Sequence, residues 1–257
     1  MSQAFTAYNT RIVTTPQGSA SPTSPNSRNV YLLALFFSVL LPVSLIYLRA
    51  LFNTKVRGKL DIDGLGAPFI GEIPVFRKNR KPNDAGMQIV FEGQSRRPIN
   101  EAFRMVRTNI EFILGNIGGG KNVIMNASLN PGSGKSFVMA NIAACEALKG
   151  KKVVIVDLDF RHSTISELVG KPSVGLSNYI AGFSETCDAY AVEGREGLYV
   201  VPVGTTPPNP TELLFNPRLE ALIDELRSSY DFVFLDCPPV EIVADSSIIT
   251  KYADMTV

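Results

Sequence analysis

The chain contains few of the residues that build metal centres or disulfide frameworks. Its 257 residues include no tryptophan, one histidine, His162, and three cysteines: Cys145, Cys187 and Cys237. A single histidine argues against a histidine-based metal site, and the cysteines show no metal-ligand spacing. An odd number of scattered cysteines also argues against a disulfide framework, so we expect buried free thiols in a reducing compartment.

Net charge is low as well. Lysine and arginine together number 25, and aspartate and glutamate together number 24, which gives a formal net charge of +1. No strong overall field therefore favours nucleic acid, and we expect no nucleic-acid partner.

Acidic residues are absent from the first 60 positions, and the stretch from Val30 to Leu48 carries no charge of either sign. As a helix this stretch spans roughly 28 Å, close to the hydrocarbon thickness of a bilayer. It lacks the polar face of a core helix. Its long polar lead and the absence of a small-residue cleavage site argue against a signal peptide. Residues 30–51 are therefore predicted to form a transmembrane helix.

Basic residues are concentrated on the C-terminal side of this span. Arg11 and Arg28 precede it, whereas four follow it closely: Arg49, Lys55, Arg57 and Lys59. The positive-inside rule then places the C-terminal side in the cytoplasm and the N-terminus outside. The membrane itself is therefore an expected partner.

The composition predicts three further regions. Residues 1–29, rich in Ser, Thr and Pro, are predicted to be an extracytoplasmic stalk, and residues 52–97 a cytoplasmic linker. The linker's basic run, residues 77–81, suits either a solvated loop or contact with anionic lipid. Residues 98–257 are predicted to form one α/β domain. This domain stops at what looks like the start of a strand, Met255–Val257, so we expect a C-terminally incomplete fragment.

Apolar runs alternate with helical patterns from Pro98 onward. Strands are expected at 122–127, 153–156, 198–203 and 232–235, and helices after residue 98, up to Leu148, over 217–230 and from near Ala244. Such alternation predicts a P-loop NTPase-type, mostly parallel sheet with helices on both faces, preceded by the one transmembrane helix.

A glycine-rich turn follows the first expected strand. Its two glycines free backbone N–H groups to face phosphate oxygens, its lysine would reach the β- and γ-phosphates, and its serine would ligate Mg²⁺. The match covers the GK[ST] core only, because Leu129 stands where the full pattern has glycine. The expected nucleotide-binding residues are Asn130, Pro131, Gly132, Ser133, Gly134, Lys135, Ser136 and Phe137.

Carboxylates follow two of the buried strands, at the edge where open α/β sheets bind ligands. Asp157 and Asp159 end one strand, and Asp236 ends another. One of the first pair is expected to hold Mg²⁺ through water and the other to accept a proton from an attacking hydroxyl. The plainer alternative is a set of ordinary loop acids, and Asp245 is a weaker candidate.

Four charged residues share the polar face of the helix that follows Pro98: Glu101, Arg104, Arg107 and Glu111. Taken by themselves, these residues suit a solvated helix face stabilised by i,i+3 and i,i+4 pairs.

Together these motifs resemble the bacterial tyrosine kinases. GSGKS, VVIVDLDFR and FVFLDCPP are similar to that family's Walker A, A′ and B segments, and the run from Glu101 to Asn109 fits its E-x-x-R-x-x-R-T-N helix. The segment Pro208–Leu214 also resembles a family segment. The membrane helix resembles the second span of the polysaccharide co-polymerases fused to such kinases, which act at the bacterial inner membrane. The resemblance covers nearly the whole chain.

The resemblance implies an ATP-dependent protein-tyrosine autokinase that uses ATP and Mg²⁺. It assigns Lys135, Asp157 and Asp159 to catalysis and Ser136, Asp159 and Asp236 to the metal. It also assigns Glu101, Arg104 and Arg107 to contacts between subunits of a homo-oligomeric ring.

The expected partners are tyrosine-containing proteins, a cognate tyrosine phosphatase and the machinery that polymerises and exports capsular or extracellular polysaccharide, whose chain length the family regulates. The family's C-terminal tyrosine cluster is missing here, since the tyrosines are scattered.

Two other functions remain as alternatives. One is a membrane-tethered ATPase switch of the MinD/ParA type, although Asn130 stands where such proteins carry a signature lysine. The other is a non-catalytic co-polymerase subunit, which the retained lysine and aspartates disfavour. A GTPase is less consistent with the sequence, because the base-reading N-K-x-D motif is absent.

Overall fold

A computed structural model describes residues 18, 25–53, 58, 62, 64, 66–76, 86–118, 122–239 and 245–257. Most of the predicted stalk, the basic run 77–81 and the basic positions 55, 57 and 59 lie outside the described residues. The chain divides into two compact units, Met1–Gly64 and Leu65–Val257.

The first unit contains one long helix, α1, Ser27–Leu51. Asn26 caps it, since its side chain accepts a hydrogen bond from the Arg28 amide at 3.2 Å. The hydroxyls of Ser38 and Ser44 donate to backbone carbonyls within the helix, at 2.8 and 2.9 Å. Among the described residues, α1 is the one helix long and apolar enough to cross a membrane. The predicted apolar helix is therefore present.

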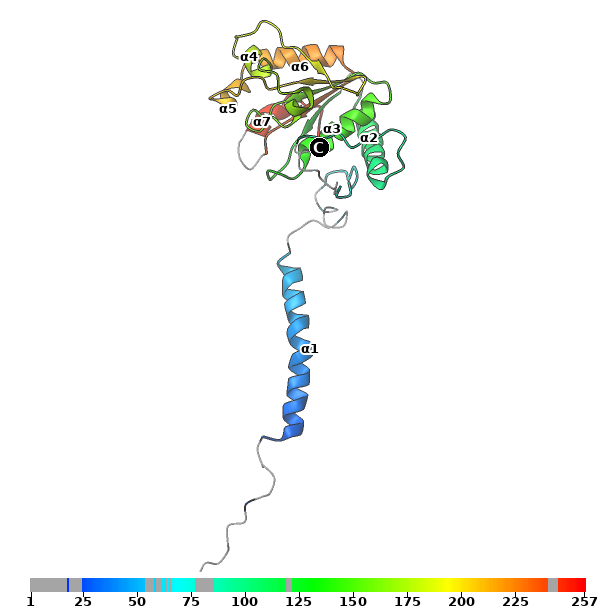
Figure 1. The fold of residues 1–257 in the computed structure, drawn as a ribbon, viewed down its shortest axis with the longest axis vertical. Coiled ribbons are helices and arrows are strands. Elements are labelled where there is room, and N and C mark those ends of the chain that lie inside the picture. Colours follow the sequence, from blue (N-terminus) through cyan, green and yellow to red (C-terminus); the bar gives the residue numbers. More distant parts are fainter. Residues whose placement is uncertain are drawn as a thin grey trace, which may run out of the picture. The chain divides into compact units, whose positions relative to one another are not determined.

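The second unit is built on a six-stranded sheet in the order β3-β4-β2-β5-β1-β6 (Figure 1). Every neighbouring pair is parallel except β3 with β4. The strands are β1 Val123–Asn126, β2 Val153–Asp157, β3 Tyr190–Ala191, β4 Leu198–Val201, β5 Phe232–Asp236 and β6 Met255–Thr256. The predicted parallel sheet is confirmed.

Helices cover both faces of this sheet, as predicted (Figure 1). One face packs against α2 Pro98–Ile117 and α3 Lys135–Ala147, and the other against α4 Leu176–Ile180, α6 Pro217–Ser229 and α7 Asp245–Thr250. Side chains of β2 alternate between the two cores: Val153 and Ile155 join the first, Val154 and Val156 the second. Burial on both faces explains the unbroken apolar run of this strand.

Element bounds lie close to the predicted ones, and the differences have physical causes. The strand predicted over 198–203 stops at Val201, because Pro202 has no N–H to donate to a neighbouring strand. The carbonyls of Pro202 and Val203 instead accept hydrogen bonds from Leu176 and Ser177, both at 2.9 Å. Two short helices, η2 Ile165–Val169 and α5 Pro210–Leu213, lie in the connections.

Part of the predicted linker packs against the sheet unit. The buried Asn141 on α3 accepts hydrogen bonds through its Oδ1 from the amides of Val90 and Phe91, at 2.8 and 2.9 Å. Arg195 donates to the Phe91 carbonyl at 2.9 Å, and the Phe91 ring is buried. Pro98 is thus the start of α2, whereas the compact unit already begins at Leu65.

Candidate nucleotide site

Three adjacent parallel strands bring the predicted site together. The register pairs Asn126 with Asp236 and Asp157 with Asp236 across β1, β5 and β2. Since the carboxyl ends of parallel strands meet at one edge, the loop after β1 and the acids of β2 and β5 lie at the same edge of the sheet.

The loop after β1 has the open backbone that a phosphate cradle needs. Gly132 and Gly134 have φ angles of +72° and +94°, and a Cβ added at either would meet no atom within 4 Å. In this part of the described chain, the amides from Gly132 to Ser136 donate no hydrogen bond to a protein acceptor. Gly134 is the N-cap of α3, so the loop leads directly into the positive end of a helix.

The first residues of α3 carry a charged cluster. The Lys135 ammonium lies 3.1 Å from Asp236 Oδ1 and 3.5 Å from Asp159 Oδ2. The Ser136 hydroxyl donates to Asp236 Oδ2 at 2.6 Å. The two carboxylates are 0% and 4% exposed, so one lysine balances two acids in a largely dry site.

Asp157 has different partners from Asp159. Its Oδ2 accepts hydrogen bonds from the Ser166 amide at 2.9 Å and from the Ser166 hydroxyl at 2.7 Å. Asp159 instead faces Lys135 and accepts from the His162 amide at 3.2 Å. The two acids of the VDLD segment are both buried, but only Asp159 contacts the lysine.

Burial raises the pKa values of Asp157 and Asp236. Desolvation raises the pKa of Asp157 to about 7, the charges of Asp236 and Asp159 add to the rise, and the Ser166 hydrogen bonds oppose it. Desolvation also raises the pKa of Asp236, against the opposing charge of Lys135. A carboxylate with a pKa near neutral is suited to accepting a proton.

The remaining predicted loop residues occupy different environments. Asn130, Pro131 and Ser133 are exposed at the turn. The Phe137 ring instead packs into the core, 6.1 Å from the Phe103 ring, so only its backbone can face a nucleotide. The side chain of Asp245 lies outside the described residues.

The predicted interface residues also make contacts within the chain. Arg104 pairs with Glu101, donates to the Gly93 carbonyl at 2.6 Å and stacks 5.7 Å from the Phe91 ring. Arg107 points toward α3 and donates to the Cys145 sulfur at 3.5 Å. Contact of these residues with a second copy stays a prediction.

Two contributors were not predicted from the sequence. Asn126 donates through its Nδ2 to the Lys135 carbonyl at 2.6 Å and so links the end of β1 to the start of α3. A polar residue closing an apolar strand was the available signal. The sequence carries no comparable signal for Ser166, because nine residues and a turn separate it from Asp157.

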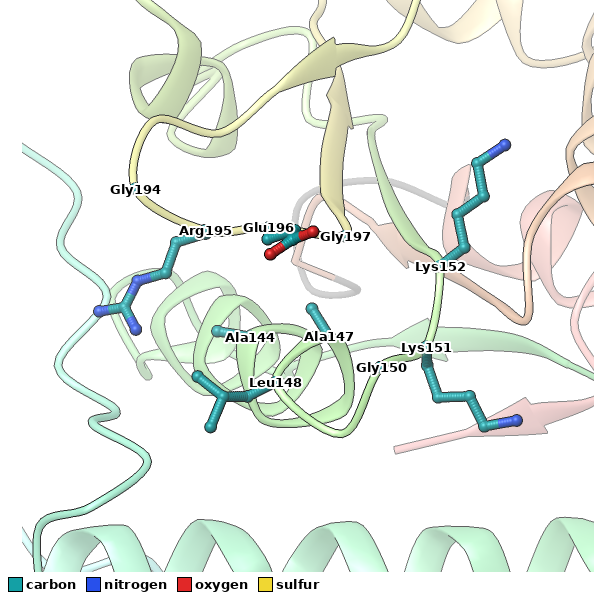
Figure 2. Close-up of a pocket in the computed structure, with 10 residues that line it drawn as sticks. All are labelled: Ala144, Ala147, Leu148, Gly150, Lys151, Lys152, Gly194, Arg195, Glu196 and Gly197. Atoms are coloured by element: carbon teal, nitrogen blue, oxygen red, sulfur yellow. The ribbon is translucent and has the colours of Figure 1, made fainter.

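A different cavity lies at the opposite edge of the sheet, before the starts of β2 and β4 (Figure 2). It measures about 530 Å³ and has basic residues on its wall. Those residues are already engaged: Lys151 pairs with Asp231, Lys152 lies 4.5 Å from the Tyr230 ring centroid, and Arg195 binds backbone carbonyls. The loop edge is therefore the better candidate site.

The loop edge fits a nucleoside triphosphate and Mg²⁺. Its unused amides and Lys135 suit phosphate oxygens. Ser136, Asp159 and Asp236 offer the hard oxygen ligands that Mg²⁺ prefers, together with phosphate and water. No group of three or more His, Cys, Asp or Glu side chains in the described residues is arranged to hold a metal ion.

The fold and this site define a P-loop protein of the ATPase type. The family model described as ATPase MipZ matches residues 122–257. The chain belongs to this ATPase family.

Similarity to bacterial tyrosine-protein kinases extends over nearly the whole chain, which confirms the predicted resemblance. AmsA of Erwinia amylovora is 30% identical over 98% of this chain and 36% of its own length. Tyrosine-protein kinase wzc of Salmonella typhimurium is 28% identical over 100% of this chain and 37% of its own length. The kinase domain of Escherichia coli ETK is 26% identical and superposes with a TM-score of 0.68, covering 79% of this chain and 80% of that domain. The chain spans little more than a third of the full length of AmsA and of wzc.

Proposed function

We propose that the chain is the kinase part of an ATP-dependent protein-tyrosine kinase. The observation that supports this most is the shared cluster of Lys135, Ser136, Asp159 and Asp236 beside the open loop. The similarity to tyrosine-protein kinases over nearly the whole chain supports the same function. Bound Mg²⁺–ATP would supply the transferable γ-phosphoryl group.

Each side chain then has a distinct role. Lys135 exchanges its two carboxylate partners for phosphate oxygens and neutralises charge there. Ser136, Asp159 and Asp236 hold the metal. Asp157, whose pKa is raised to about 7, accepts the proton of the acceptor tyrosine hydroxyl.

The experiment is transfer from γ-labelled ATP to a tyrosine-containing copolymer in Mg²⁺, with the intact chain in detergent. We expect label on phosphotyrosine after acid hydrolysis, and its loss in Lys135→Met. Equal labelling by this variant would refute the assignment. Lys151→Met, altered at the opposite edge of the sheet, is the matched control and should keep its activity.

The second candidate is an ATPase switch, which the match to the ATPase MipZ model favours. It predicts that the parent chain releases inorganic phosphate from ATP without labelling tyrosine. The same assay separates the two functions, because both products are counted from one reaction.

The cellular setting follows from the relatives and from α1. We propose that α1 anchors the chain in a bacterial inner membrane with the kinase unit in the cytoplasm. We further propose that the protein assembles as a ring through Glu101, Arg104 and Arg107. Its tyrosine-bearing substrates, a cognate phosphatase and the polysaccharide export machinery would be its partners, and polysaccharide chain length its output.

A further inference from the structure

We propose that Ser166 is a positioning residue that fixes the orientation of the Asp157 carboxylate for phosphoryl transfer. This inference rests on the proposed function, in which Asp157 accepts the proton of the acceptor. It names a residue that lies outside the sequence motifs of the site, nine positions after Asp157.

The geometry around Ser166 is directional. Its amide and its hydroxyl both donate to the same oxygen, Oδ2 of Asp157, at 2.9 and 2.7 Å. Among the described residues, the other carboxylate oxygen, Oδ1, accepts only from the Asp159 amide, at the longer distance of 3.3 Å. Two short bonds on one oxygen hold the carboxyl group against rotation and leave Oδ1 as the less engaged oxygen.

The Ser166 hydroxyl is itself held in place. It accepts a hydrogen bond from the Val203 amide at 2.9 Å, so its own proton is directed at Asp157. Val203 follows β4, whereas Asp157 ends β2, and the serine therefore ties the ends of two adjacent strands together. Ser166 and Asp157 are 2% and 0% exposed, so water does not replace these bonds readily.

The local backbone accounts for how the serine reaches this position. After Asp159 the chain turns through Ser163, whose φ is +44°, and its amide donates to the Asp159 carbonyl at 2.8 Å. Ile165 then anchors η2 in the core with 0% exposure. The next residue, Ser166, faces back toward the end of β2.

The test compares kcat and KM for ATP in tyrosine-copolymer phosphorylation by the intact chain. For Ser166→Ala we expect kcat to fall about tenfold to a hundredfold, the loss typical of a hydrogen bond to a charged group, with KM within about twofold. Ser166→Thr keeps the hydroxyl and should recover most of kcat. An unfolding scan of each variant confirms that it is folded.

A matched control separates positioning from packing. Ser177 is equally buried and donates its hydroxyl to the Thr205 carbonyl after β4, but it does not touch Asp157. Ser177→Ala should keep kcat within about twofold. An equal loss in both alanine variants would overturn the positioning role.

The double variant Asp157→Asn with Ser166→Ala tests whether the serine acts through the aspartate. We expect it to be no slower than Asp157→Asn alone. Two results would refute this inference and leave the proposed function standing. One is that Asp157→Asn is inactive while Ser166→Ala keeps full activity. The other is that the two losses in kcat multiply in the double variant. Full activity of Asp157→Asn, or a parent chain that labels no tyrosine, would instead refute the proposed function and this inference with it.

Discussion

Glu146 on α3 is a buried acid whose ionisation should cost measurable stability. Its carboxyl group is 0% exposed and shares a hydrogen bond with the Glu111 carboxylate on α2. Desolvation raises its pKa to about 8, and the Glu111 carboxylate on α2 adds to the rise, while Arg107 and Lys149 oppose it. We predict that Glu146→Gln stabilises the protein at alkaline pH.

The magnitude follows from linkage. Glu146 has a higher pKa in the folded chain than in the unfolded chain, so the unfolded state releases this proton first. Stability is then lost as the pH rises from about 4.5 to about 8. At about 1.36 kcal/mol per pH unit the upper limit is about 5 kcal/mol. The protein relaxes around the charge, and the titration of Glu146 is coupled to that of Glu111. Both effects reduce the expected loss of stability to roughly 2 kcal/mol, or about 4–8 °C in Tm.

The assay is thermal unfolding followed by circular dichroism in detergent at pH 5.0 and 8.5. The parent should lose stability between the two, whereas Glu146→Gln should unfold several degrees above it at pH 8.5 and near it at pH 5.0. Glu225→Gln, at an exposed position on α6, is the control and should follow the parent at both values. A Glu146→Gln chain that melts with the parent at pH 8.5 would show that this carboxylate is not desolvated.

Three further predictions concern assembly and packing. Arg104→Ala with Arg107→Ala should lower the mass measured by light scattering, and an unchanged mass would disprove their interface role. Asn141→Ala removes the acceptor of two backbone amides and should cost about 3 kcal/mol in denaturant unfolding; a cost below about 1 kcal/mol would mean that the segment before α2 is not held there. Gly175→Ala should destabilise by more than about 1 kcal/mol, because its Cβ would lie 2.4 Å from the Pro202 carbonyl oxygen; unchanged denaturant unfolding would refute that contact.

The sheet and the core of the site could be predicted because their signals are local. The apolar runs ending in Asp157 and Asp236 imply buried parallel strands, and the carboxyl ends of such strands form the ligand edge. The loop glycines and Lys135 carry their chemistry in adjacent positions. The structure places all of these at one edge, as the sequence implied.

The contributions that escaped prediction depend on contacts between distant residues. Asn141 accepts hydrogen bonds from the amides of residues 90 and 91, about 50 positions earlier in the chain. Because that stretch has no periodic pattern, its sequence alone suggested a linker and not a packed segment. The Ser166 contact with Asp157 depends on a turn in which Ser163 has a positive φ. A serine in the sequence does not predict this backbone conformation. The polar face of α2 suggested solvent for Arg107, yet this side chain is directed at α3.

The central claim is that this site transfers phosphate to tyrosine, and the fate of the γ-phosphate tests it most directly. A single turnover with limiting γ-labelled ATP, Mg²⁺ and a tyrosine-containing copolymer gives two countable products, phosphotyrosine and inorganic phosphate. The account predicts that phosphotyrosine is the main product and that Lys135→Met forms neither. Label released only as inorganic phosphate by the parent chain would contradict it and would favour the ATPase switch.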